Sequence, residues 1–317
     1  MKPPYSSFEH LVLSVCSNRG KGWRFVMADA QTVYVDDSGT DSKSRIAAAA
    51  FCVSTVDRWL AFESSWRKIA VRAGFNLKDW HMTEFAACRS NHICPQCRHG
   101  ETSIKEHPWQ KWTEKKRENV LRRMAKALVK HVECGWGIAH TKEDYEKYVR
   151  DSPARALANE PIGQEHFTFA IQQCGGEFAR WRSIQNRQDQ LKFVFDTSSK
   201  RQKREIAKVF FAAANERTQY DGGIEQWFED VGVAYESRRT VPQLLAADML
   251  AWTIATIRSR DVYRRGRSVE MLQLGYIFTG ANAKHINIGY TPEKPFIEWE
   301  QRILENADSG KNDNDET

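Results

Sequence analysis

The sequence predicts an α/β protein in which strands and helices alternate along the chain. Short apolar runs rich in β-branched and aromatic residues have the length of strands, and longer segments repeat apolar residues at helical spacing. Two of the predicted strands, at residues 32–36 and 191–196, end in an aspartate. Because functional groups of open α/β sheets collect beyond the carboxyl ends of the strands, these aspartates also indicate where a site would form.

The first elements follow from local composition. Residues 32–36 form a β-branched and aromatic run that stops at the turn sequence at 37–39, which predicts a strand. Residues 46–53 are small and apolar and predict a second strand. Residues 56–73 place tryptophan, phenylalanine, leucine and isoleucine on one broad face at helical spacing, which predicts a long amphipathic helix.

The rest of the chain continues the alternation. The further helices are expected at residues 114–132, 165–181, 203–215 and 241–257, and the further strands at 134–140, 191–196 and within 227–235. The helix at 241–257 is apolar over most of its circumference near its start, which predicts that it is buried.

Composition divides the chain into a domain and two flanking segments. Residues 1–30 show weak periodicity and are interpreted as an N-terminal extension, and residues 304–317 form an acidic tail that we expect to be disordered. The domain is therefore expected at 31–303. A polar segment at 88–112, which contains cysteines and histidines, is interpreted as an insertion within it.

The charge balance favours a polyanionic partner. The formal net charge is +6 at pH 7 although the last residues are mostly acidic, so the domain is more basic than the total. We expect a nucleic acid as the partner, with a solvated basic surface as the alternative for each cluster. The candidate contacts are Lys200, Arg201, Arg238 and Arg239.

The cysteine pattern and the hydropathy place the protein in the cytoplasm. Seven cysteines at irregular spacing argue against the disulfide framework of a secreted protein. No signal peptide is visible, and no run approaches the roughly 18 apolar residues that a membrane span needs. We therefore expect a cytoplasmic protein without a membrane partner, and the sequence leaves its oligomeric state open.

Three aspartates lie in apolar surroundings, where a charged side chain needs a binding partner. Asp36 and Asp196 each end a predicted strand, where a turn or capping role is the alternative. Asp248 lies inside the last predicted helix, and its neighbours one turn away on both sides are apolar. An unpaired buried carboxylate is costly, so Asp248 needs a metal, a cation, a proton or a hydrogen-bonded partner. Glu84 is a fourth candidate, which a solvated position would also explain.

Four short motifs, in this order, resemble a large bacterial family labelled as a domain of unknown function. They are the strand with Asp-Asp-Ser-Gly at 33–39, the His-x-x-Glu segment at 81–84, the strand ending in Asp196, and Ala-Asp-Met-Leu at 247–250. That family is similar to the ribonuclease-H-like nucleases and integrases. The chain departs from it at Asp37, where a glutamate is usual, and at Leu245, where glutamine is usual, with Gln243 upstream.

The resemblance implies a ribonuclease-H-like mixed sheet flanked by helices, and acidic residues that bind two divalent cations. Asp36, Glu84, Asp196 and Asp248 would be the catalytic ligands of Mg²⁺ or Mn²⁺, with Asp36 bridging both ions. Carboxylates without thiols suit such hard cations, and paired cations activate water and stabilise a leaving oxygen.

The insertion holds a candidate zinc site. Cys94 and Cys97 have the C-x-x-C spacing of a zinc knuckle. Cys88, His92, His99 and His107 are close enough in sequence to complete a tetrahedral set, and Cys88 and His99 are the preferred ligands. Such a structural zinc would hold together a segment too polar to fold by itself. Reduced, free cysteines in a polar loop are the alternative.

The sequence therefore predicts a divalent-metal-dependent nuclease, or a related phosphoryl transferase acting on nucleic acids. One alternative is a phosphatase of the haloacid-dehalogenase kind with Asp36 as nucleophile, although Ser38 stands where that family has its second aspartate. Another is a non-catalytic nucleic-acid-binding protein of the same fold.

Overall fold

The structure is a computed structural model of the 317-residue chain. It describes residues 31–39, 44–88, 98–99, 103–104, 107–153, 165–185, 191–196, 203, 206, 232–263, 286–290, 301 and 305. The expected extension at 1–30, most of the expected helix at 203–215 and nearly all of the acidic tail lie outside the described residues.

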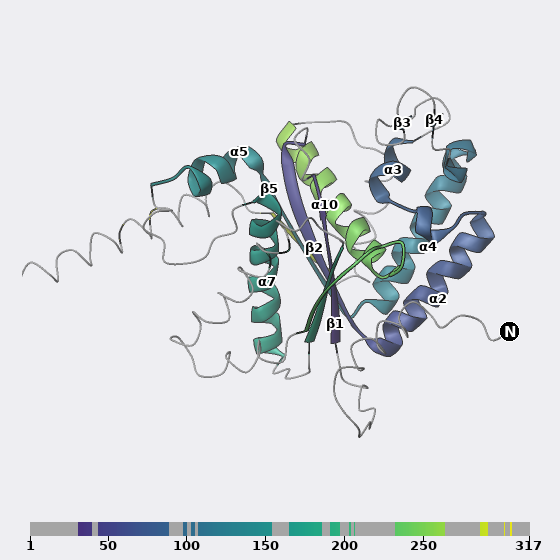
Figure 1. Ribbon diagram of the computed structural model, residues 1–317, viewed down its shortest axis with the longest axis horizontal. Coiled ribbons are helices and arrows are strands. Elements are labelled where there is room, and N and C mark those ends of the chain that lie inside the picture. Colours follow the sequence, from purple (N-terminus) through teal and green to yellow (C-terminus); the bar gives the residue numbers. More distant parts are fainter. Residues whose placement is uncertain are drawn as a thin grey trace, which may run out of the picture.

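A six-stranded mixed sheet forms the centre of the described fold (Figure 1). Its strands, in spatial order, are β7 (Gly232–Glu236), β6 (Leu191–Asp196), β1 (Gln31–Ser38), β2 (Ile46–Thr55), β5 (Cys134–Thr141) and β8 (Ile286–Tyr290). β1, β2 and β5 form an antiparallel meander. β6 runs parallel to β1, β7 parallel to β6, and β8 parallel to β5.

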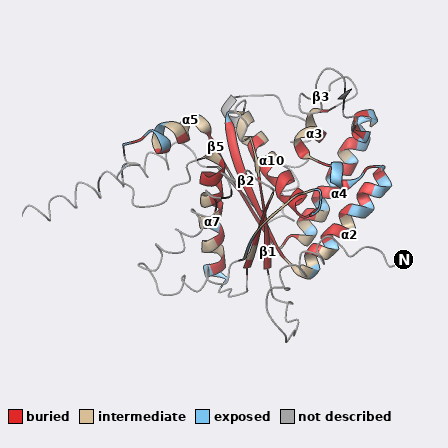
Figure 2. Cartoon of the chain, viewed as in Figure 1, coloured by how far each residue is buried: buried red, intermediate tan, exposed pale blue. Residues whose placement is uncertain are grey.

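Helices cover both faces of this sheet (Figure 1). The α10 face carries α2 (Val56–Ala73), α4 (Glu114–His131) and α10 (Leu244–Tyr263), and the α7 face carries α7 (His166–Ile184). The shorter elements are α3 (Met82–Ala87), α5 (Lys142–Tyr145), the 3-10 turns η1 (Leu77–Asp79) and η3 (Pro108–Lys111), the π-helical turn η4 (Glu146–Arg150), and the strand pair β3 (Arg98–His99) and β4 (Ser103–Ile104). β1, β2 and β5 are buried along most of their length, as are the inner sides of the long helices, whereas the described side chains of β7 are half-buried or exposed (Figure 2).

Small residues let α10 lie close against the sheet. Ala48 and Ala50 of β2 face this helix, and β5 presents glycine at positions 135 and 137. A Cβ built on Gly137 would stand 1.7 Å from Ile254 Cδ1 of α10, a separation that real atoms never have. Glycine at this position therefore lets Ile254 of α10 pack directly against the backbone of β5.

The described elements confirm the α/β class and most of the expected element positions. α2 has the expected bounds, and α4, β5 and β6 agree with expectation to within one residue. α10 begins at Leu244 rather than 241 and continues to Tyr263, and the edge strand β8 was not predicted. None of the described helices combines the length and the apolar character that crossing a membrane requires.

Candidate functional site

Two parallel strands bring the first two aspartates together. β1 and β6 pair in parallel register up to Val35 opposite Phe195, which brings Asp36 and Asp196 side by side at the carboxyl ends of neighbouring strands. β1 does not stop at Asp36 as expected, because pairing with β2 continues it to Ser38. Side chains alternate between faces along a strand. Tyr34 and Val194 both pack on the α10 face, and the aspartates two residues further on project to that same face.

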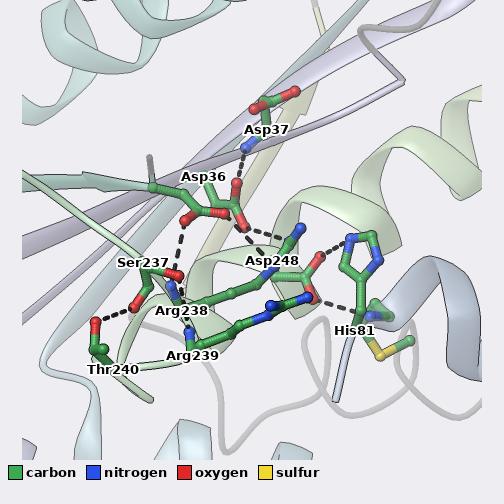
Figure 3. Close-up of polar contacts among 10 residues, drawn as sticks. Asp36, Asp37, His81, Ser237, Arg238, Arg239, Thr240 and Asp248 are labelled. Carbon is green, nitrogen blue, oxygen red and sulfur yellow. Dashed lines mark hydrogen bonds and ion pairs between the residues drawn. The ribbon is translucent and has the colours of Figure 1, made fainter. Parts of the chain in front are cut away.

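The third aspartate reaches this point from α10. Asp248 is 2% exposed, and its Oδ2 accepts a hydrogen bond of 2.9 Å from the backbone N–H of Met82 at the start of α3. His81 Nε2 lies 3.6 Å from Asp248 Oδ1 (Figure 3). The apolar neighbours of Asp248 on its helix thus bury a carboxylate that is held by α3 and still directed toward the strand ends.

A cation stands among the three carboxylates. The Arg238 guanidinium places Nε 3.6 Å from Asp196 Oδ2 and Nη1 3.9 Å from Asp36 Oδ2. The Arg238 backbone N–H also donates to Asp196 Oδ1 at 3.3 Å. Asp248 acts electrostatically on the same guanidinium, and Figure 3 shows the Arg238 side chain extending from its turn toward Asp36 and Asp248.

The carboxyl group of Asp36 is strongly affected by its surroundings. Burial raises the pKa of its carboxyl well above the usual value, and the carboxylates of Asp248, Asp37 and Asp196 raise it further, whereas Arg238 acts in the opposite direction. Its Oδ1 accepts a hydrogen bond of 2.8 Å from the backbone N–H of Asp37. Its Oδ2 is buried and has no hydrogen-bond partner among the described residues, only the long ion pair with Arg238. An additional positive charge would therefore be most favourable at this oxygen.

The other predicted acid, Glu84, has a different contact. It lies on α3, whose first residue binds Asp248, but its Oε2 is 3.2 Å from His107 Nε2. His107 is buried and stacks on Trp109. In this structure it is His81 that stands beside Asp248, and the His-x-x-Glu spacing was the signal in the sequence that could have marked this histidine as a site residue.

The two ends of the insertion are held by a buried arginine. Arg117 of α4 donates to the backbone carbonyls of Phe85, Cys88 and Trp109, and its guanidinium lies over the Phe85 ring. Cys88 is buried beside this arginine. Cys94 and Cys97 lie outside the described residues, as does the His99 side chain, so the zinc site stays a prediction.

Of the four basic residues expected to contact a nucleic acid, two are described. Arg238 and Arg239 lie in the turn between β7 and α10, beside the aspartates, and Arg239 is exposed. Lys200 and Arg201 lie outside the described residues. The expectation for Arg238 missed its ion pairs with Asp36 and Asp196, because no local pattern links the three segments.

The donor set suits a hard divalent cation. It consists of carboxylate oxygens, which Mg²⁺ and Mn²⁺ prefer, and it includes the unpartnered Asp36 Oδ2. As the side chains stand, no group of three histidine, cysteine or acidic residues in the described ranges is close enough together to hold a metal ion. The guanidinium of Arg238 is the group that stands among these oxygens.

Comparisons with protein-family models, with curated proteins and with solved structures found no significant match.

Proposed function

We propose that this protein is a divalent-metal-dependent nuclease, or a related phosphoryl transferase acting on nucleic acids. The observation that carries the proposal is the convergence of Asp36, Asp196 and Asp248 at the carboxyl ends of β1 and β6. Among them is Asp36 Oδ2, a buried oxygen without a hydrogen-bond partner among the described residues. Such a concentration of negative charge destabilises the metal-free protein, so a site built this way has a use for cations.

The arrangement of the sheet supports a ribonuclease-H-like fold. The antiparallel meander of β1, β2 and β5 is extended by two parallel strands, β6 and β7, and helices cover both faces. The candidate ligands stand on β1, at the middle of the sheet, on its parallel neighbour β6, and on the helix packed across them. This agrees with the order of the motifs that suggested the resemblance.

The residues of the candidate site would have different roles in this reaction. Asp36, Asp196 and Asp248 would hold Mg²⁺ or Mn²⁺. Glu84 of α3, whose carboxylate lies 3.2 Å from His107 in this structure, would be the fourth ligand. When bound, such cations activate water and stabilise the leaving oxygen of a phosphodiester. The Met82 N–H fixes the Asp248 carboxylate, and the Asp37 N–H fixes that of Asp36. Arg239, exposed in the turn between β7 and α10, would contact the phosphate backbone.

The first test is cleavage of labelled DNA and RNA, single- and double-stranded, in Mg²⁺, Mn²⁺ or EDTA. We expect cleavage by the wild type that EDTA stops. Asp36→Asn should reduce it at least about a hundredfold, because even the outer partners of metal ligands contribute factors of about 10–100. Asp79→Asn is the matched control, since Asp79 is exposed and carries the same charge change.

Two outcomes would contradict the proposal. Wild-type cleavage rates in Asp36→Asn, with metal still required, would remove Asp36 from the centre. A small phosphomonoester that leaves a phosphoryl group trapped on Asp36, in the absence of any nucleic-acid cleavage, would instead establish the phosphatase alternative.

A further inference from the structure

Arg238 has an anchored backbone and a side chain that extends from it. Its N–H binds Asp196, and the turn that follows is closed by hydrogen bonds from Thr240 and Val241 to the Ser237 carbonyl. The guanidinium, by contrast, makes two ion pairs with the described residues, at 3.6 and 3.9 Å, both longer than a normal hydrogen bond. The Arg238 side chain is 30% exposed, so it has a route toward solvent.

The guanidinium stands where the carboxylates need positive charge. It approaches Asp36 Oδ2, the buried oxygen without a hydrogen-bond partner, and Asp196 Oδ2 at once. A divalent cation held by these two oxygens would occupy the same space and carry twice the charge. The two cations therefore exclude each other, both by volume and by mutual repulsion.

We propose that Arg238 is the resident cation of the metal-free centre, and that a divalent cation must displace it to bind. This inference rests on the proposed function, because it assumes that Asp36 and Asp196 are metal ligands. Displacement turns the guanidinium toward solvent from an anchored backbone, beside Arg239, where a phosphate group can accept its hydrogen bonds. Metal binding therefore frees the Arg238 guanidinium to bind a phosphate of the nucleic acid. While the metal is absent, the same guanidinium partly neutralises the carboxylates of Asp36 and Asp196.

The test is the affinity of the full-length protein for Mn²⁺ alone, measured by isothermal titration and by the electron paramagnetic resonance signal of free Mn²⁺. Arg238→Gln removes the competing charge and should tighten Mn²⁺ binding at least about tenfold. Arg239→Gln is the matched control, because it removes the same charge from the adjacent, exposed position, and it should change the affinity by less than about threefold.

Thermal unfolding with and without Mn²⁺ gives a second readout. Arg238→Gln should lower the melting temperature in EDTA and enlarge the increase that Mn²⁺ produces, because the metal-free carboxylates have lost their cation. Arg238→Lys retains the charge and should fold if the glutamine variant does not. The lysine side chain is shorter and carries one compact ammonium group in place of a planar guanidinium, so it should contact the two carboxylates less well. The Mn²⁺ affinity of Arg238→Lys should therefore lie between those of the wild type and Arg238→Gln.

The possible results distinguish a failure of the displacement by Arg238 from a failure of the proposed metal centre. Equal Mn²⁺ affinity in the wild type, Arg238→Gln and Arg238→Lys, with Asp36→Asn still abolishing binding, would overturn the displacement and leave the metal centre intact. If Arg238→Gln and Arg239→Gln increased the Mn²⁺ affinity equally, the effect would come from the overall positive charge of this surface, and the displacement would also be overturned. No Mn²⁺ binding by any of the proteins would overturn both proposals.

Discussion

Two buried titratable groups stand at the same end of the sheet, on opposite faces. Asp36 of β1 projects to the α10 face, and His140 of β5 projects to the α7 face, two strands away. Burial is the largest influence on both, and it favours the neutral form of each: the pKa of Asp36 is raised well above its usual value, whereas that of His140 is lowered to about 3. The surroundings of the two groups nevertheless differ.

His140 is surrounded by rings. Tyr145, His166 and Phe169 have their ring centroids 5.2 to 5.7 Å from that of the His140 imidazole, and this cluster joins β5 to α7. Asp36 is instead surrounded by other carboxylates and by an arginine. Burial alone therefore does not mark a functional group. The α10 face differs because several carboxylates lie close together there. Their mutual repulsion costs stability, and nothing in the packing of the core requires it.

The largest expected effect tests the neutral state of His140. The unfolded histidine gains a proton near its ordinary pKa of about 6.5, but the folded one does not, so His140 contributes stability that is fully present above that pH and is lost as the pH falls toward 3. Relative to His140→Phe, the wild type should lose about 2–3 kcal/mol of unfolding free energy between pH 7 and pH 4.5. Urea denaturation at a series of pH values measures this, and parallel curves for the two proteins would show that His140 is protonated in the fold.

The next effect tests how closely α10 must approach the sheet. Gly137→Ala places a Cβ against Ile254 and should lower stability by about 1–3 kcal/mol through overpacking. Shortening the partner in the double variant Gly137→Ala with Ile254→Val should recover part of that loss, and a double-mutant cycle on urea unfolding measures the coupling. Purely additive effects would mean that the contact between β5 and α10 is looser than the structure has it.

The comparison also shows what the sequence could predict. Asp36, Asp196 and Asp248 were identifiable because each breaks a local rule: a charge directly after a buried strand, or within an apolar helical stripe. The ion pairs of Arg238 were not, because they depend on how β7 and its turn lie beside β6. Glu84 and His81 illustrate the same limit, since the motif places both residues near the centre but only the folded backbone decides which one faces Asp248.

The pH dependence of Asp36→Asn should have the opposite sign from that of His140. In EDTA, the unfolded Asp36 is ionised above a pH of about 4, whereas the folded one keeps its proton to higher pH, so the wild type loses stability as the pH rises between the two pKa values. The asparagine variant has no such proton to lose. It should therefore be more stable than the wild type at pH 7, and the difference in unfolding free energy should shrink toward pH 4. A wild type that is the more stable protein at pH 7 would mean that Arg238 outweighs burial at Asp36.

The smallest effect tests the packing of the helix on the other face. A Cβ on Gly175 of α7 would meet no atom within 4 Å, in contrast to one on Gly137. Gly175→Ala should therefore stabilise the protein by about 0.5–1 kcal/mol, because alanine restricts the unfolded chain and suits a helix interior. Urea denaturation at pH 7 measures the gain, with Gly137→Ala as its counterpart of opposite sign. A loss on Gly175→Ala would show that α7 is covered at this point by another part of the chain or by a second molecule, and that the two faces of the sheet are packed equally tightly.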